Sequence, residues 1–477
     1  MRLYLYALRA AKPRQLRARV LRPLARRRFP GGEPPRDAEP VPGARELWGS
    51  PAFEASSPPD ASTRLGRFHR QYGDDVLAAA RAGDAAEARR LVATWIEAHP
   101  PRVGDAWHPY PLATRVGNWI AALTLVPELA SPELSRSLWR QLRRLERNVE
   151  DDVLGNHVIR NARALVLGGA AFGAAELTRR GIAILRREVP EQILRDGGHY
   201  ERSPAYHLVV LRDLLEIQAV TPHSWLADAI ERMREFAAAL MRPDGAPALF
   251  NDGTVDAPQL ELPEPRAGLS VFGESGFVVA RDGPLWLAFR CGVAAPRFLP
   301  AHAHADALSF QLWWHGRPVV VDPGTFTYEP GADRNWFRST RAHSTVVVDG
   351  RDQFRLWGSF RSGRLPKVAL RYARENAVEA SVVLAGRIRH VRRIEWAGNE
   401  VHVYDRVEGR GRHRIESRVP WAPHAPADID VVSGEHAVSE EAWLSERFGE
   451  RVATTAAVIL AELDLPASIA FRVRCLD

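Results

Sequence analysis

The densest group of residues capable of chemistry is the hexapeptide AHAHAD at positions 301–306. In an extended segment, His302, His304 and Asp306 point to one face of the chain while the small alanines occupy the other. Two imidazoles on neighbouring positions of one face are a common metal-binding arrangement. The alternative interpretation is a set of hydrogen-bonded surface histidines, and the spacing alone leaves both open.

Further ligand types stand downstream. Three valines at 319–321 lead into Asp322, which places a carboxylate at the end of a predicted strand. His343 stands at the start of another β-rich run. Since side chains of neighbouring strands can converge, histidine and aspartate here predict a zinc site with water as the fourth ligand.

A second polar group lies earlier in the chain. Asn156 and His157 begin a predicted helix, and the segment DGGHYERSPAYH contains His199, Tyr200 and Tyr206. Asn156 alone is equally typical of a helix cap, and a single tyrosine or histidine is more often structural. Gathered on a loop before a helix, these residues together indicate a site.

A third group contains Trp107, His108, Arg115, Asn118 and Trp119. Exposed aromatic rings beside arginine and asparagine suit sugar stacking and carboxylate binding. The competing interpretation is helix packing, which is favoured for Trp119.

Helices are predicted to position the second and third groups. Ser131-Pro132-Glu133 has the N-cap, first-turn proline and early acid of a helix start, and Ser203-Pro204 repeats the first two features. Further segments with helical periodicity lie at 83–98, 111–126, 156–173, 174–188 and 224–241. Seven or more helices with short loops predict a stack of helical hairpins.

After residue 265 the pattern changes to short β-rich runs. They lie at 284–290, 307–314, 317–321, 344–349, 377–384, 391–396 and 400–405. His315-Gly316 and Gly398-Asn399 stand where tight hairpin turns are needed. Helices followed by strands predict an α domain and then an antiparallel β-sandwich.

Residues 1–60 are predicted to be a basic, proline-rich tail and linker. Residues 1–32 contain ten basic groups and no acid. Since the whole chain has a net charge of +7, residues 33–477 have a net charge of −3. Such a tail suits contact with a membrane surface, an assembly or an anionic polymer, or it is a solvated amphipathic helix. Leu47 and Trp48 are candidates for docking onto a domain.

Composition excludes several classes of protein. With 45% hydrophobic and 26% charged residues, the chain is typical of a globular protein and not of a disordered or collagen-like one. Two cysteines imply no disulfide framework, and nucleic-acid binding is not expected because the body is acidic. No secretory signal is recognised. A cytoplasmic or inner-membrane-associated location is therefore expected over a periplasmic one.

Several segments resemble the heparinase II/III family of polysaccharide lyases. They are DGGHYERSPAYH, HAHADALSFQL, VVVDPGTFTY, FRSTRAHSTVVVDG, NHVIRNARALVLGG and WHPYPLATRVGNWI, in matching order over 107–350. The resemblance implies a multidomain chain with an incomplete (α/α) toroid at 61–265 and an antiparallel β-sandwich at 266–477. The substrate cleft would lie between them.

The resemblance also implies roles for individual residues. The expected catalytic residues are Asn156, His157, Tyr200 and His302, and the expected ligands of a structural zinc ion are His304, Asp322 and His343. Expected substrate contacts are Trp107, His108, Arg115, His199, Tyr206, Arg334 and Arg338, although Arg338 equally suits pairing with a local acid.

The implied reaction is β-elimination in an anionic, uronic-acid-containing polysaccharide. Asn156 and His157 would neutralise the uronate carboxylate as negative charge develops. Tyr200 would protonate the departing oxygen and could also be the base, while His157 and His302 are the alternative bases.

Two other functions remain open. A glycoside hydrolase needs two carboxylates roughly 6.5–9.5 Å apart, and Asp196, Glu201, Asp252 and Asp306 are available. A non-catalytic polysaccharide-binding component of exopolysaccharide synthesis or export would use the tail for docking. The arginine-rich tail favours a lyase acting on a self-made exopolysaccharide near the inner membrane.

Overall fold

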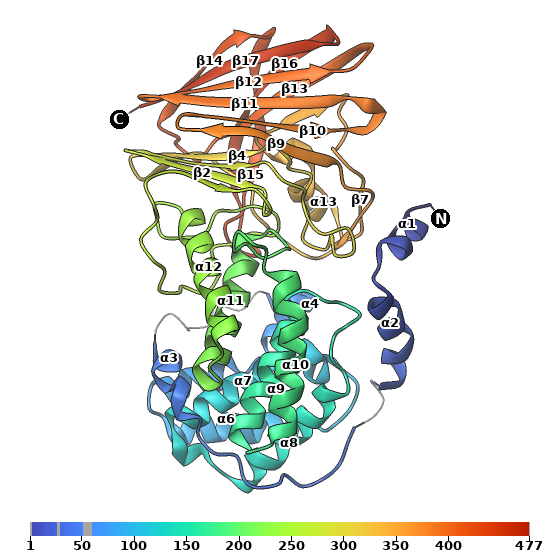
Figure 1. Cartoon of the computed structure of the whole chain (residues 1–477), viewed down its shortest axis with the longest axis vertical. Helices are drawn as coiled ribbons and strands as arrows, with labels where there is room; N and C mark the ends of the chain where they lie inside the picture. Colours follow the sequence, from blue (N-terminus) through green and yellow to red (C-terminus); the bar gives the residue numbers. More distant parts are fainter. Residues whose placement is uncertain (1, 26–28, 51–59, 477) are drawn as a thin grey trace.

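A computed structural model describes residues 2–25, 29–50 and 60–476. A helical part lies at one end of the long axis and a part built of β-sheets lies at the other (Figure 1). The last long helix of the first part ends at Leu240 and the first strand begins at Gly268, so the expected boundary at 265 falls in the connection between them. In the described residues, no helix is long and apolar enough to cross a membrane.

The helical part is built around one central helix, α9. Its members are α4 (Arg64–His69), α5 (Asp74–Arg81), α6 (Ala85–Ala98), α7 (Pro109–Leu125), α8 (Pro132–Glu146), α9 (Asn156–Ala171), α10 (Ala175–Gln192), α11 (Pro204–Val220) and α12 (Ser224–Leu240). Helix α9 packs against α7, α8, α10 and α11. The predicted caps are confirmed, because Ser131 Oγ accepts from Leu134 N at 3.1 Å and Ser203 Oγ accepts from Tyr206 N at 3.3 Å.

The β part consists of antiparallel sheets. One sheet has the order β1-β2-β3-β4-β5, the second β14-β17-β12-β11-β10-β9, the third β15-β16-β13-β6, and a small fourth β7-β8. The strands are β1 (Gly268–Phe272), β2 (Phe277–Asp282), β3 (Leu285–Arg290), β4 (Phe310–Trp314), β5 (Arg317–Val320), β6 (Val346–Val348), β7 (Leu356–Trp357), β8 (Arg361–Ser362), β9 (Lys367–Arg374), β10 (Ala377–Val383), β11 (Arg389–Ala397), β12 (Glu400–Glu408), β13 (Arg412–Pro420), β14 (Ala427–Ser433), β15 (His436–Leu444), β16 (Val452–Asp464) and β17 (Ala467–Cys475). A short helix, α13 (Ala332–Arg338), interrupts the strands. Side chains of the three large sheets share one apolar core.

The two parts meet through α12 and the first sheet. Phe236 and Leu240 of α12 pack in one apolar cluster with Phe277, Trp286 and Trp313 of the sheet. This contact fixes the end of the helical part against the β part and thereby brings their connecting loops together.

The N-terminal residues are packed on the body, which corrects the prediction of a separate tail. Helices α1 (Arg2–Ala10) and α2 (Pro13–Ala25) run along one side of the molecule from the β part to the helical part (Figure 1). The ring of Tyr4 lies 4.8 Å from that of Trp357, whereas Arg22 pairs with Asp152. The predicted docking of Trp48 is confirmed, because its indole is 1% exposed and donates to Glu216 at 2.8 Å.

A buried ion cluster joins the second sheet to the loops of the β part. Arg392 Nε and Nη2 each donate to an Asp405 carboxylate oxygen at 2.7 Å, and Arg392 Nη1 donates to the carbonyl oxygens of Leu308 and Ser344. Burial alone would raise the pKa of Asp405, but Arg392 and His390 outweigh it and hold that pKa well below its usual range.

Replacing Arg392 should therefore destabilise the β part. Arg392→Ala leaves a buried carboxylate without its cation, so we expect a loss of about 3–5 kcal/mol in the free energy of unfolding, measured by denaturant titration. The neighbouring Arg393, whose side chain is 38% exposed, is the matched control, and Arg393→Ala should cost less than about 1 kcal/mol.

The same ion pair sets a pH dependence. Because the folded pKa of Asp405 is depressed, the difference between wild type and Arg392→Ala should be full above about pH 4 and shrink as the pH falls below it. A difference that stays constant down to acidic pH would contradict this assignment.

Candidate active site and metal site

His302 lies between two carboxylates from different segments. Its Nδ1 is 2.8 Å from Asp252 Oδ2, and its Nε2 is 3.2 Å from Glu201 Oε2. The ring also stacks on Tyr206 at 4.0 Å between centroids. Both ring nitrogens therefore face carboxylate oxygens, which fix the orientation of the ring.

Asp252 is the centre of this cluster. In addition to His302, it accepts from Arg334 Nη2 at 2.8 Å and from His304 Nε2 at 2.9 Å. Burial would raise the pKa of Asp252, but Arg334 and the two histidines hold it well below its usual range. Asp252 therefore stays ionised and fixes the orientation of both imidazoles.

The loop containing Tyr200 is held against the start of α9. The hydroxyl of Tyr200 accepts from Gly155 N at 3.0 Å, and Glu201 Oε1 accepts from Asn156 N at 3.0 Å. Tyr200 is 3% exposed, and burial together with Glu201 raises the pKa of its hydroxyl well above 10. The phenol is accordingly protonated at neutral pH.

Asn156 does not cap α9, so that interpretation is wrong. Gly155 is the N-cap residue, and Asn156 is the first residue inside the helix. Gly155 has a φ of +62°, and a Cβ there would lie 2.2 Å from Glu201 Oε1. The glycine thus permits the close approach of Glu201 and leaves the side chain of Asn156 available for another partner.

His157 is oriented by a buried acid, Glu150. His157 Nδ1 lies 3.2 Å from Glu150 Oε1, and the Nδ1 of His108 lies 3.8 Å from the same oxygen. Arg22 Nη2 is 3.2 Å from it as well. Burial would raise the pKa of Glu150, but His157, His108 and Arg22 lower it to about 2.

A second cluster is a candidate metal site formed by His304, Asp322 and His343. One ligand atom from each lies within 4.8 Å of the others, and all three residues are buried. Asp322 Oδ2 is 3.8 Å from His343 Nε2. Burial and the neighbouring Asp306 raise the pKa of Asp322 well above its usual value.

Hydrogen bonds set the tautomers of both histidines. His304 Nε2 donates to Asp252, and His343 Nδ1 donates to the Ser339 carbonyl oxygen at 2.8 Å. The remaining nitrogens, His304 Nδ1 and His343 Nε2, therefore present lone pairs that face each other at 3.3 Å. Two lone pairs this close repel unless a cation lies between them, so the donor set fits a metal ion.

The structure separates the residues of the AHAHAD hexapeptide. Residues 301–309 contain two turns and irregular segments, and none of them belongs to a strand. Only His304 belongs to the metal cluster, whereas His302 lies beside Tyr206 and Asp306 pairs with Arg290 at 3.1 Å. The prediction that three side chains share one face is wrong because the segment is not a strand.

Two predicted substrate contacts lie in the helical core. Arg115 is 0% exposed, and its guanidinium donates to Gln141 Oε1 at 2.9 Å and to the Gln71 carbonyl oxygen at 2.7 Å. Trp107 is also buried, and its indole donates to the His99 carbonyl oxygen. Both side chains bond within the helical part, and their contact with substrate stays a prediction.

Three more predicted substrate contacts are buried supports of the site. His199 bonds to Gln192 Oε1 at 3.0 Å, Arg334 holds Asp252, and Arg338 Nε donates to the Ala303 carbonyl oxygen at 3.1 Å. All three are buried, as are Asn156 and Tyr200, and their contact with substrate stays a prediction.

Two of the predicted substrate contacts remain beside the catalytic cluster. Tyr206 is partly buried, stacks on His302 and shares a hydrogen bond of 2.8 Å with the hydroxyl of Tyr328. His108 is partly exposed and lies beside Glu150. Tyr328 and Glu150 were not predicted as site residues from the sequence, and Glu201 and Asp252 were predicted only as acids of a hydrolase.

Helix α2 lies against the candidate catalytic cluster, which consists of Asn156, His157, Tyr200 and His302. Gln15 Nε2 donates to the carbonyl oxygen of Phe298 at 3.4 Å, and the Phe298 ring lies 5.8 Å from that of Tyr200. Arg14 Nη1 is 2.7 Å from Glu188 Oε1, and Arg22 reaches Glu150. The polar face of α2 therefore covers one side of the site.

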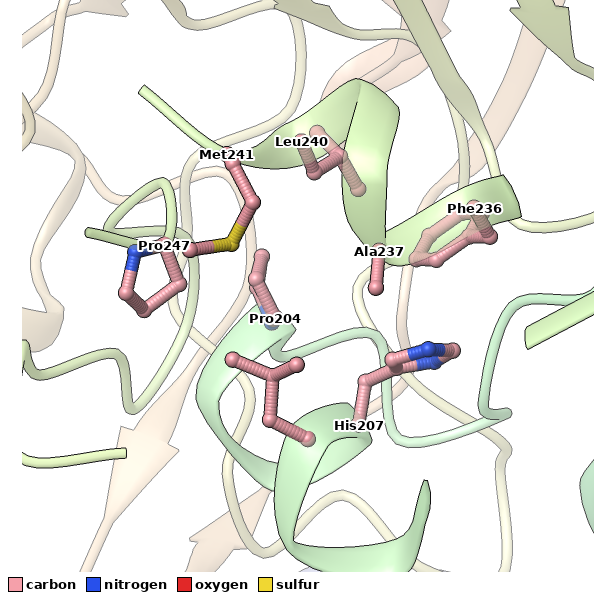
Figure 2. A pocket seen from close by; sticks show the side chains of 8 residues that line it. Pro204, His207, Phe236, Ala237, Leu240, Met241 and Pro247 are labelled. Atoms are coloured by element: carbon pink, nitrogen blue, oxygen red, sulfur yellow. The ribbon is translucent and has the colours of Figure 1, made fainter. Parts of the chain in front are cut away.

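A separate hollow near the site carries no chemistry of its own. Figure 2 shows that Pro204, Phe236, Leu240 and Met241 surround it with apolar groups, with His207 as its polar residue. Both ring nitrogens of His207 are used, one by His199 N at 3.2 Å and the other by the Met233 carbonyl oxygen at 2.9 Å. The hollow is a gap in packing where α11 begins and α12 ends.

The ion pairs of Arg22 should hold α2 over the site. Arg22→Ala removes the cation shared by Glu150 and Asp152, so we expect backbone amides of α2 to exchange hydrogen at least about tenfold faster, measured by mass spectrometry. Arg19→Ala, an exposed change on the same helix, is the control and should leave exchange unchanged. Equal hydrogen exchange in Arg22→Ala and Arg19→Ala would contradict the conclusion that the ion pairs of Arg22 hold α2.

Two family models match adjoining parts of the chain. The model "Heparinase II/III N-terminus" matches residues 85–276, and "Heparinase II/III-like, C-terminal" matches residues 264–472. Together they extend from residue 85 to residue 472 and cover both the helical and the β part.

Individual relatives match at lower coverage. A heparin-sulfate lyase of Bacteroides stercoris is 28% identical over an alignment of 241 residues, and the match covers 42% of this chain. The chain spans only 36% of the length of that lyase. FtsZ-localized protein C of Caulobacter vibrioides is 26% identical over an alignment of 347 residues, and the match covers 66% of this chain and 60% of that protein.

A solved structure establishes the fold. The crystal structure of heparinase III superposes with a TM-score of 0.71 at 15% identity, over 96% of this chain and 89% of that one. This likeness confirms the incomplete toroid followed by a sandwich. With both domain models matched in the same order as these parts, the chain belongs to the heparinase II/III family.

Proposed function

We propose that the protein is a polysaccharide lyase that cleaves a uronic-acid-containing polysaccharide by β-elimination. The observation that carries the proposal is the grouping of a protonated Tyr200 with Asn156, His157 and His302 at the junction of the two parts. Family relatives named as heparin-sulfate lyases support the same reaction.

The first requirement of the reaction is neutralisation of the uronate carboxylate. Removal of the C5 proton places further negative charge on that group, so nearby donors must strengthen their contact as the charge develops. The amide of Asn156 is free of helix capping, and the ring of His302 is held in place by Asp252 and Glu201. Both favour an anionic sugar ring at this point.

Tyr200 is the proposed acid. Its raised pKa keeps the phenol protonated, which suits donation to the departing glycosidic oxygen and opposes a role as the resting base.

His157 is the proposed base. Its Nδ1 faces Glu150, which leaves Nε2 to accept the C5 proton, and its side chain is 26% exposed. His302 is less suited, because both of its nitrogens already face carboxylates.

The hydrolase alternative is not favoured. An inverting hydrolase needs one carboxyl group that stays protonated as the acid. Asp252 is ionised by Arg334 and two histidines, and Asp196 accepts from Ser275 N at 2.8 Å. Glu201 is engaged by Asn156 N and His302. Burial raises the pKa of Asp306 to about 6, but this acid is 0% exposed and pairs with Arg290 at 3.1 Å, so it does not face the cluster.

A non-catalytic role has one specific support. FtsZ-localized protein C matches a longer part of this chain than the lyase of Bacteroides stercoris, and its name refers to a location and not to an activity. The presence of Asn156, His157, Tyr200 and His302 in one cluster favours the lyase, because binding alone does not require all four.

For the metal site we propose zinc in a structural role. A tetrahedral ion with metal–nitrogen bonds of about 2.0–2.1 Å separates its nitrogen ligands by about 3.3–3.4 Å. This agrees with the 3.3 Å between His304 Nδ1 and His343 Nε2. Bound zinc would fix His304 and, through Asp252, the orientation of His302.

The lyase proposal is tested by ultraviolet absorbance of the unsaturated uronate. The panel contains heparan sulfate, hyaluronan, alginate, glucuronan and host exopolysaccharide. Wild type should act on at least one polymer, and Tyr200→Phe should lower the rate by about 10²–10⁴-fold because the acid is lost. Tyr404→Phe, which removes a hydroxyl from β12, is the control and should retain activity.

Other outcomes separate the alternatives. New reducing ends without absorbance would establish a hydrolase. Polymer binding that survives Tyr200→Phe, with no turnover in wild type or in Arg22→Ala, would support the non-catalytic role. The Arg22 variant is included because α2 covers the site.

Metal analysis tests the zinc proposal. Purified wild type should contain about one zinc per chain, and His343→Ala and Asp322→Ala should lose most of it. His390→Ala is the matched control, since His390 is also buried and bonded to an aspartate, at 2.7 Å. Equal zinc loss in that control would show that the loss follows general unfolding.

A further inference from the structure

Helices α1 and α2 expose an unusual share of large apolar side chains. Of the thirteen exposed large hydrophobic residues in the described chain, six lie in these two helices. They are Tyr4 (58% exposed), Leu5 (48%), Leu8 (51%), Leu16 (36%), Val20 (74%) and Leu21 (48%). The other seven are scattered over the body. Because the ring of Tyr4 also contacts Trp357, the remaining five residues of α1 and α2, the outward apolar face, need their own explanation.

Helix α2 buries polar side chains and exposes apolar ones, which is the opposite of an ordinary surface helix. Its buried side contains Gln15 and Arg22, which bond to the body. Its outward side contains Leu16 and Val20, which are four residues apart and therefore share one face. A helix that buries polar groups and exposes apolar ones gains stability from an apolar partner.

The positive charge of α1 and α2 indicates the chemistry of that partner. Seven basic residues and no acidic one lie between Arg2 and Arg22. Lys12, Arg14 and Arg22 pair with acids of the body. Arg9, Arg17 and Arg19 are exposed on the same helices as the apolar face.

We propose that the outward apolar face of α1 and α2 docks on an anionic lipid surface. Apolar side chains bordered by arginines are the pattern of helices that lie in the interface of a membrane with anionic headgroups. A second copy of the chain would bring like charges together. A soluble polyanion would leave the apolar residues exposed. The inference goes beyond the lyase function and does not depend on it.

The two helices extend along one side of the molecule (Figure 1). Because Tyr4 contacts the β part at Trp357 and Arg22 contacts the helical part at Asp152, docking would place both parts beside the lipid surface. The catalytic cluster would then lie directly behind α2.

The test is co-sedimentation of the full chain with vesicles. Vesicles are made of phosphatidylcholine alone or of equal parts phosphatidylcholine and phosphatidylglycerol. Wild type should bind the anionic vesicles and not the neutral ones. Leu16→Gln/Val20→Gln should weaken binding at least about tenfold, and Arg17→Gln/Arg19→Gln should weaken it about fivefold for each arginine removed.

Matched controls remove similar groups from the body. Val103→Gln/Val432→Gln changes two valines that are 62% and 66% exposed, and Arg195→Gln/Arg364→Gln removes two exposed charges. Both controls should bind the anionic vesicles as wild type does.

Three results would overturn the proposal. One is absence of binding to anionic vesicles. The second is binding lost with the arginines but unchanged in Leu16→Gln/Val20→Gln, which would indicate a simple polyanion contact. The third is a dimer in light scattering that Leu16→Gln/Val20→Gln dissociates, in a protein that does not bind vesicles.

Discussion

The ion pair between Asp252 and Arg334 is the interaction on which both sites depend. Asp252 follows the helical part in sequence, whereas Arg334 belongs to α13 inside the β part. The carboxylate oxygens of Asp252 also bond to ring nitrogens of His302 and His304. A single buried carboxylate thus orients His302 of the candidate catalytic cluster and His304 of the candidate metal site. The charge of this carboxylate is compensated only while the two parts stay together.

This shared carboxylate gives the metal cluster a physical connection to the proposed chemistry. His304 presents Nδ1 to the metal position because its Nε2 proton is taken by Asp252. The other oxygen of Asp252 faces His302, whose second nitrogen faces Glu201. Glu201 in turn holds the backbone of Asn156. Rigidity at the metal position is therefore transmitted through hydrogen bonds to the start of α9 without any change of fold.

Local patterns in the sequence predicted much of the scaffold but little of this network. Periodicity and caps predicted α8 and α11, because those signals lie within a few residues of each other. The partners of Asp252 are 50 and 82 residues away, and no local pattern pairs them. The burial of Arg115 was not predicted, because residue type does not reveal it. Its neighbours Gln71 and Gln141 become visible only when the helices are packed.

The N-terminal helices also show that partners distant in sequence are not predicted by local patterns. Their positive charge is plain in the sequence, but the acids that use it, Glu150 and Glu188, lie in the body and are recognisable only in the fold. Glu150 contacts both Arg22 and His157. Movement of α2 therefore changes the charge next to the proposed base as well as the access to Tyr200. Since the opposite side of α2 is apolar and exposed, whatever binds that side acts on a helix already joined to the site by an ion pair.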